Sequence, residues 1–292
     1  MLGFPLQTVI GQLLLGLING SFYAILSLGL AIIFGLLNII NFAHGTLYML
    51  GAYVAWALLT YAGVSYWGAL IIAPLVVGIF GILLERLFLK GLYKLEHLFG
   101  LLMTLALSLI IEGVMQNNFG VSGQAYEIPE ILSGSTRLGN VVLPIYRSWV
   151  VVASLVVCIG TWWIIEKTKL GSYLRACTEN PELVGTFGIR VPRLIMLTYG
   201  AGVALAGFAG VLAAPVYSIS PHMGSDLMIV VFAVVVIGGM GSIMGSIVTG
   251  YLLGIAEGLT RLIYPEASAV IVFIIMGIVL IFKPNGLFGG RE

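Results

Sequence analysis

The chain has 292 residues, of which 60% are hydrophobic and only 9% are charged, and its formal net charge at pH 7 is +1. Soluble domains carry about 25% charged residues, so this composition excludes an ordinary soluble protein. It also argues against a nucleic-acid partner, because binding one would need a basic surface patch.

The first third of the chain is almost free of charge. Residues 1–84 contain no Asp, Glu, Lys or Arg, and the first charged side chain is Glu85. A charge at the bilayer centre costs roughly 2.5–3.5 kcal/mol, and one membrane-spanning helix needs about 20 apolar residues. The stretch therefore predicts several consecutive spans. Since no Lys or Arg precedes Arg86, we expect no cleaved signal peptide.

Nine hydrophobic segments follow one another along the chain. They lie at roughly 8–35, 38–60, 67–89, 98–118, 148–166, 194–217, 227–241, 246–261 and 268–282. The segments after residue 226 are short, so eight and nine spans are both compatible with the pattern. We predict an all-α fold, with residues 1–292 forming one polytopic transmembrane bundle of 8–9 spans that has room for broken or re-entrant helices.

The distribution of Lys and Arg predicts the orientation, because cytoplasmic loops are enriched in them. Five such residues lie in or beside the segment 168–193, whereas the longer segment 119–147 holds two. They are Lys167, Lys169, Arg175, Arg190 and Arg193 in the first, and Arg137 and Arg147 in the second. The segment 168–193 is therefore predicted to be cytoplasmic and 119–147 external. Nine spans then place the N-terminus outside and the C-terminus inside.

A small polar cluster interrupts the charge-free stretch. Asn38, Asn41 and His44 are spaced three residues apart, which predicts one polar stripe on a helix face. Polar residues inside a membrane often mark a functional site, so the stripe is a candidate lining of a translocation path. The alternative is that these side chains form interhelical hydrogen bonds that hold the bundle together.

Two carboxylates lie inside apolar segments. Glu112 precedes a polar segment end, and Glu257 has Arg261 four residues later, a spacing that allows an ion pair on one helix face. Each carboxylate is within about two helical turns of a predicted end. We expect both to lie near the outer interface and to be partly hydrated, with a role in a proton relay as the alternative.

A glycine-rich run follows Ile237. Gly241 and Gly245, and then Gly250 and Gly254, stand four residues apart. This small-xxx-small spacing predicts close helix packing. It does not predict a phosphate loop, because no Gly-Lys pair occurs anywhere in the chain.

The segment 170–189 contains a helix start. Asn180 suits the N-cap position and Pro181 the first helical position. Leu183, Val184 and Phe187 follow as an apolar stripe. Such a stripe predicts either docking to a partner surface or packing on the protein's own membrane domain or the lipid headgroups.

Two of these segments together resemble a known family. The run NFAHGTLYMLGAY (41–53) and the loop 171–189, with Arg175-Ala176 and Phe187-Gly188-Ile189, are similar to the permeases of branched-chain amino acid ABC transporters, the LivH type. The resemblance extends over nearly the whole chain in order and spacing. Urea and short-amide permeases share much of this signature, so they remain an alternative.

The resemblance implies a permease subunit of an ABC importer in the bacterial inner membrane. Its partners would be a second, LivM-like permease, two cytoplasmic ATP-binding subunits and an external substrate-binding protein, and it would hold no cofactor or metal. In that family the loop corresponding to 171–189 couples the permease to the ATPase. This implies a coupling role for Arg175, Asn180, Leu183, Val184, Phe187 and Gly188.

Two other functional classes would need different sequence features. A self-sufficient secondary transporter would need an ionisable group on its path, for which Glu112 and Glu257 are the candidates. A membrane enzyme would need a reactive motif, but the chain contains neither His-Glu-x-x-His nor Gly-x-Ser-x-Gly. The sequence therefore predicts a transport protein rather than an enzyme.

Overall fold

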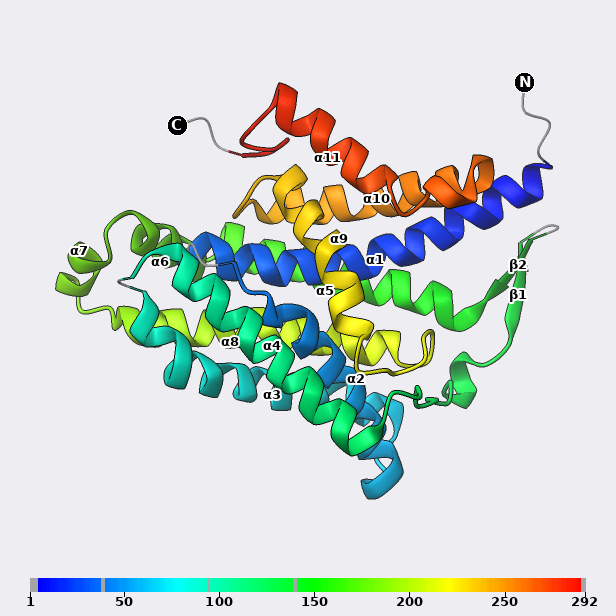
Figure 1. Ribbon diagram of the computed structural model, residues 1–292, viewed down its shortest axis with the longest axis horizontal. Coiled ribbons are helices and arrows are strands. Elements are labelled where there is room, and N and C mark those ends of the chain that lie inside the picture. Colours follow the sequence, from blue (N-terminus) through cyan, green and yellow to red (C-terminus); the bar gives the residue numbers. More distant parts are fainter. Residues whose placement is uncertain (1–4, 38–39, 94, 139–140, 290–292) are drawn as a thin grey trace.

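The computed structural model describes residues 5–37, 40–93, 95–138 and 141–289, and almost all of the regular structure in these ranges is helical (Figure 1). The α-helices are α1 (Leu6–Leu37), α2 (Ala43–Ala62), α3 (Tyr66–Leu84), α4 (His97–Phe119), α5 (Ile145–Lys167), α6 (Lys169–Glu179), α7 (Pro181–Thr186), α8 (Val191–Ala213), α9 (Met223–Gly238), α10 (Ile243–Ile263) and α11 (Ile271–Phe282). The strands are β1 (Ser135–Leu138) and β2 (Val141–Pro144).

Each of the nine hydrophobic segments predicted from the sequence coincides with a helix, which confirms an all-α bundle. Helices α1, α4, α5, α8 and α10, and α3 with its continuation to Leu92, are long and apolar enough to cross a membrane. Helices α9 and α11 are shorter, with 16 and 12 residues. The protein is a multi-pass membrane protein, and the number of complete spans stays a prediction.

The two loops assigned to opposite sides of the membrane lie at opposite ends of the bundle. Helices α6 and α7 are at the left end in Figure 1, whereas strands β1 and β2 and the start of α1 are at the right end. We refer to these as the α7 end and the hairpin end. The C-terminal segment lies toward the α7 end, because Phe288 lines a cavity there together with residues of α6.

The segment 119–147 has more structure than a loop. Strands β1 and β2 pair as an antiparallel hairpin in which Ser135 lies opposite Pro144. Nearer α4, Gln124 and Ile219 exchange two backbone hydrogen bonds, with N···O distances of 2.8 and 2.9 Å. These bonds attach the segment to the connection between α8 and α9.

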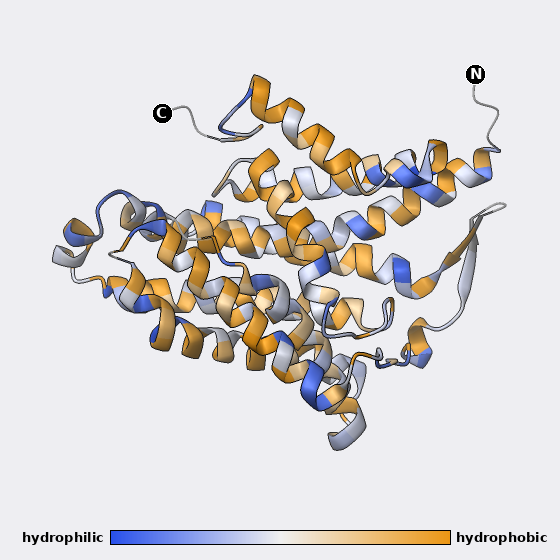
Figure 2. Cartoon of the chain, in the orientation of Figure 1, coloured by the Kyte–Doolittle hydropathy of each residue, from blue (hydrophilic) through white to orange (hydrophobic). Residues whose placement is uncertain are grey.

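The outer surface of the bundle is apolar. Leu109 and Ile110 of α4 and Val156 of α5 are more than 60% exposed, and Figure 2 shows hydrophobic residues along the outward sides of α3, α4 and α11. An exposed apolar surface of this extent would drive aggregation in water. Lipid tails are its natural solvent.

Backbone contacts between glycine-bearing helices form the centre of the bundle. Helix α1 packs along α10 and also contacts α8. A Cβ added to Gly16 would stand 2.5 Å from the carbonyl oxygen of Gly254, and one added to Gly250 would stand 2.6 Å from the amide nitrogen of Ala24. Only small residues permit such close approach.

Helix α8 makes similar contacts with its neighbours. A Cβ on Gly29 of α1 would stand 2.6 Å from the carbonyl oxygen of Gly202. Gly51 of α2 faces Gly207 in the same way. The helices α1, α2, α8 and α10 therefore form one closely packed unit.

We predict that Gly250→Ala destabilises the protein, because the added methyl group would overlap the backbone of Ala24. Overpacking of this kind costs about 1–3 kcal/mol. Gly277→Ala on α11 is the matched control, because a Cβ there meets no atom within 4 Å. Thermal unfolding of both variants in detergent is the measurement. Equal midpoints for the two would contradict the close contact between α1 and α10.

Candidate functional site

The chain between α1 and α2 leaves the helical path near the polar cluster. Residues 40–42 precede α2, which begins at Ala43. Thr104 of α4 supports this break: its hydroxyl donates to the carbonyl of Ile40 at 3.1 Å and accepts from the amide of Phe42 at 3.2 Å. A side chain from another helix thus replaces the helical hydrogen bonds that this segment lacks.

The predicted single stripe on one helix face does not hold for Asn41 and His44, because Asn41 precedes α2. Asn41 lies in the break, and its amide nitrogen donates to the Tyr199 hydroxyl of α8 at 2.9 Å. His44 lies in the first turn of α2, and its Nε2 is 3.1 Å from the carbonyl oxygen of Leu26 in α1. The two side chains therefore bond to different helices, Asn41 to α8 and His44 to α1. Asn38 lies outside the described residues.

Asn41 and His44 are both buried in this conformation, at 1% and 0% exposure. Among the described atoms, Asn41 Oδ1 and His44 Nδ1 have no hydrogen-bond partner. Most buried polar atoms in folded proteins have one. Their present contacts are interhelical, and their assignment to the solute path stays a prediction.

Glu257 is a buried carboxylate at the centre of a polar network. Its carboxylate accepts from the Tyr23 hydroxyl of α1 at 2.6 Å and from the Arg261 guanidinium at 2.6 Å. Asn19 of α1 approaches the same carboxylate at 3.5 Å, and Tyr217 donates to Asn19 at 3.0 Å. The ion pair with Arg261 confirms the prediction from the i, i+4 spacing.

Glu112 is held in a similar way. Its carboxylate contacts Nδ1 of His222, and the Ser225 hydroxyl donates to it at 3.3 Å. Glu112 and Glu257 are only 9% and 8% exposed, so both are more buried than the expected partly hydrated position. The sequence did not indicate the tertiary partners that allow the carboxylates to be buried.

The segment predicted to couple the permease to an ATPase forms α6 and α7. Asn180 is the N-cap of α7 as predicted, and its side chain accepts from the amide of Leu183 at 2.9 Å. Val184 is buried against Cys177 and Val191. Leu183 and Phe187, by contrast, are 54% and 76% exposed. The predicted apolar stripe is therefore divided, with Val184 facing the protein and the other two facing outward.

The two remaining residues of the predicted coupling set lie on either side of α7. Arg175 of α6 forms an ion pair with Glu166 of α5 at 3.3 Å, and both side chains are about half exposed. Gly188 has a φ of 81°, a left-handed conformation that suits glycine. It ends the turn that connects α7 to α8.

The four predicted packing glycines lie at three contacts. Gly250 and Gly254 face α1. Gly245 faces the backbone of Gly238 at the end of α9. Gly241 has a φ of 86° in the tight connection between α9 and α10, and a Cβ there would stand 3.2 Å from the Cα of Gly35.

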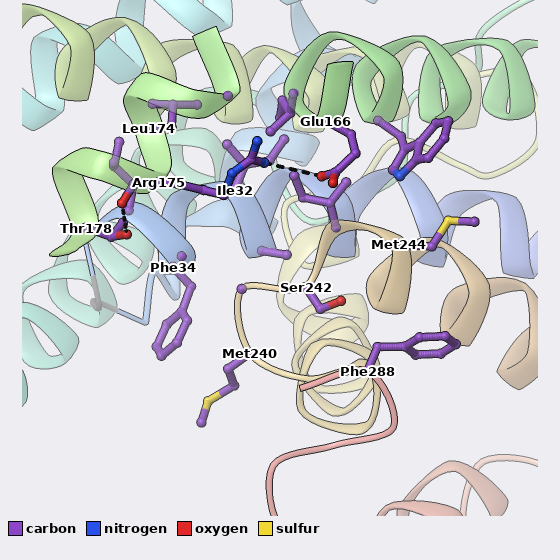
Figure 3. Close-up of a pocket in the computed structure, with 18 of the residues that line it drawn as sticks. Ile32, Phe34, Glu166, Leu174, Arg175, Thr178, Met240, Ser242, Met244 and Phe288 are labelled. Carbon is purple, nitrogen blue, oxygen red and sulfur yellow. Dashed lines mark hydrogen bonds and ion pairs between the residues drawn. The ribbon is translucent and has the colours of Figure 1, made fainter. Parts of the chain in front are cut away.

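A cavity of about 680 Å³ opens at the α7 end (Figure 3). The ends of α1 and α5, helix α6, the α9–α10 connection and the C-terminal segment enclose it. In Figure 3 the Arg175–Glu166 pair lies on one side, and Ser242, Met240 and Phe288 lie across from it.

Sequence reasoning missed several partners in these sites. Tyr199, Thr104 and Tyr23 lie within apolar runs, and each forms a buried or partly buried interhelical hydrogen bond. A hydroxyl in a membrane segment is a weak signal, because its partner cannot be identified from spacing along one helix. Glu166 was missed because it lies in the charged end of α5, where a solvated side chain is the ordinary expectation.

Comparisons with known proteins agree on one family. A family model described as the permease component of branched-chain amino acid transport systems matches residues 12–282. The chain is 31% identical to the high-affinity branched-chain amino acid transport system permease protein BraD of Pseudomonas aeruginosa, over 96% of each chain. It is 28% identical to the corresponding LivH of Escherichia coli, also over 96% of each chain. It is 28% identical to LivM of Escherichia coli, over 91% of this chain and 67% of LivM.

We predict that Arg261→Met destabilises the protein more than Glu257→Gln does. The first change leaves a buried carboxylate without its cation, which costs about 3–5 kcal/mol when the pair is fully buried and less here because Arg261 is 41% exposed. The second removes the buried charge. Adding Glu257→Gln to Arg261→Met should restore part of the loss. Thermal unfolding of the three variants tests this, and a double variant less stable than Arg261→Met would contradict it.

Proposed function

The chain belongs to the family of branched-chain amino acid transport system permease components, and we propose that it is the membrane-spanning subunit of an ABC importer for these amino acids. The single observation that carries the proposal is the match to this family over residues 12–282. On this proposal the subunit itself is not an enzyme, and its partners hydrolyse ATP. The membrane would be the bacterial inner membrane.

The proposed coupling element is the segment formed by α6 and α7. Exposed apolar side chains outside lipid favour a protein partner, and Leu183 and Phe187 supply them at the α7 end. Closure of two ATPase subunits on ATP binding would move this segment. Because α7 packs on α8 and α6 on α5, the movement would pass to the spans in a two-state change of access.

A second permease subunit would complete the path. Escherichia coli contains both LivH and LivM, and each is similar to this chain. Pairing of two related permeases would place the path between or within them, and a substrate-binding protein would dock at the hairpin end. The named relatives transport branched-chain amino acids, which supports these solutes over the alternative of urea or short amides.

We predict that Phe187→Asp abolishes association with the ATPase. Burial of a Phe side chain contributes about 1.5–3 kcal/mol, and the new carboxylate would have to lose its hydration at the interface. Insertion should be normal, because Phe187 is 76% exposed at the end of α7. The measurement is co-purification of the ATPase with the permease.

Ile131→Asp is the matched control for this experiment, because Ile131 is 77% exposed and lies toward the hairpin end. The control should retain the ATPase. If Phe187→Asp also retains the ATPase and solute-stimulated hydrolysis, then the α6–α7 segment is not the coupling element.

We further predict that Asn41→Leu and His44→Leu reduce uptake more than they reduce the amount of folded protein, as a role on the solute path requires. Tyr199→Phe is the comparison, because it removes the hydrogen-bond partner of Asn41 while leaving Asn41 in place. Uptake per folded molecule should stay near wild type in that variant. Parallel loss of uptake and folded protein in the Leu variants would favour the purely interhelical role.

The proposed sidedness predicts different labelling of two engineered cysteines. Ser135→Cys at the hairpin end should react with an impermeant maleimide in intact cells, and Ser172→Cys in α6 only after permeabilisation. Both serines are exposed, and the native Cys158 and Cys177 are replaced first. Reaction of position 172 in intact cells would show that the orientation is the opposite of the proposed one.

A further inference from the structure

The cavity at the α7 end lies beside the proposed coupling segment and combines charged and apolar walls. Its volume of about 680 Å³ is within the roughly 300–1,000 Å³ range of small-molecule pockets. Its lining comes from five parts of the chain that are distant in sequence. A pocket assembled in this way depends on the folded bundle rather than on one loop.

One wall of the cavity carries a positive and a negative side chain next to each other. Arg175 Nη1 and Glu166 Oε2 are 3.3 Å apart, and the side chains are 54% and 49% exposed. A guanidinium has five N–H donors and a carboxylate has about four acceptor positions, whereas this contact uses one of each. An exposed pair of this kind contributes little to stability. Replacing the contact between Arg175 and Glu166 by contacts to a ligand would therefore cost little free energy.

The remaining walls are mainly apolar. Large apolar side chains line the rest of the cavity, namely Phe34, Trp162, Met240, Met244 and Phe288. Figure 3 shows these methionine and phenylalanine side chains around the space that the Arg175–Glu166 pair borders. Thioethers adapt their shape to branched aliphatic groups.

We propose that this cavity binds a free α-amino acid with an apolar side chain, with Arg175 contacting its carboxylate and Glu166 its ammonium group. The side chain of the ligand would lie against Met240, Met244 and Phe288. The inference rests on the proposed function for the identity of the amino acid. It adds a binding site at the α7 end, on the side where the imported solute is released.

A zwitterion fits this wall better than an anionic lipid headgroup does. Lys167 also lines the cavity, and together with Arg175 it would attract a phosphate. The Glu166 carboxylate, however, stands within 3.3 Å of the same guanidinium and would repel that phosphate. A ligand that carries one charge of each sign satisfies both members of the pair.

Occupation of the cavity would restrain the coupling segment. The ligand would contact α6 on one side and the α9–α10 connection on the other, and α6 belongs to the segment proposed to move with the ATPase. Amino acid that has accumulated at the α7 end would therefore slow ATP hydrolysis by the complete transporter.

The test is equilibrium binding of L-leucine to the full chain in lipid nanodiscs, measured by calorimetry. Leucine should bind saturably, whereas N-acetyl-leucine, which lacks the ammonium group, and leucinamide, which lacks the carboxylate, should bind at least about tenfold more weakly. Glu166→Gln should weaken leucine binding about tenfold, since it removes a charge-assisted contact. Glu179→Gln is the matched control, because Glu179 is an exposed carboxylate of α6 that does not line the cavity, and it should bind leucine like wild type.

The possible outcomes distinguish a failure of this binding site from a failure of the proposed function. Leucine uptake by the complete transporter is measured on the same preparations. If the transporter takes up leucine and Glu166→Gln does not change leucine binding, then the cavity site is overturned and the proposed function is not. Binding that depends on Glu166 supports the site even if uptake is absent, which would overturn the proposed function instead. Absence of leucine binding together with a co-purifying phospholipid that Arg175→Gln releases would overturn the site in favour of a lipid.

Discussion

The close approach of helix backbones at paired glycines is the constraint on which the rest of the structure depends. In lipid, helices gain little from burying apolar side chains against one another, so packing contacts and hydrogen bonds determine how they associate. Gly16 and Gly254 bring α1 against α10, and Gly29 and Gly202 bring α1 against α8. The polar side chains of these helices reach their partners only because the backbones are this close.

The interhelical hydrogen bonds depend on that packing. His44 reaches the carbonyl of Leu26, and Tyr23 reaches Glu257 across the α1–α10 contact. In a medium of low dielectric constant an unpaired polar group is costly, so each of these bonds favours one arrangement of the helices. The central helices are therefore fixed to one another by packing and hydrogen bonds, and the elements that we propose to move lie at their ends. At the α7 end these are α6 and α7, beside the cavity and the exposed Phe187.

Hydropathy and capping patterns predicted the helices well, because both depend on neighbouring residues. The nine apolar segments and the Asn180 cap are examples. The site geometry depends on distant residues and was harder to predict. Asn41 leaves the expected helix because Thr104, more than 60 residues away, supports the break. Glu112 is buried in contact with His222 and Ser225. No spacing along a single helix indicates such partners.

The central claim is that this chain transports branched-chain amino acids with energy from ATP hydrolysed at the α7 end. Uptake of radiolabelled leucine into proteoliposomes that hold the permease pair, the ATPase subunits and the binding protein tests it most directly. The account predicts accumulation only when ATP is present on the side of the α7 end, and no effect of collapsing the proton gradient. Accumulation of leucine by this chain alone, driven by a proton gradient and independent of ATP, would contradict it.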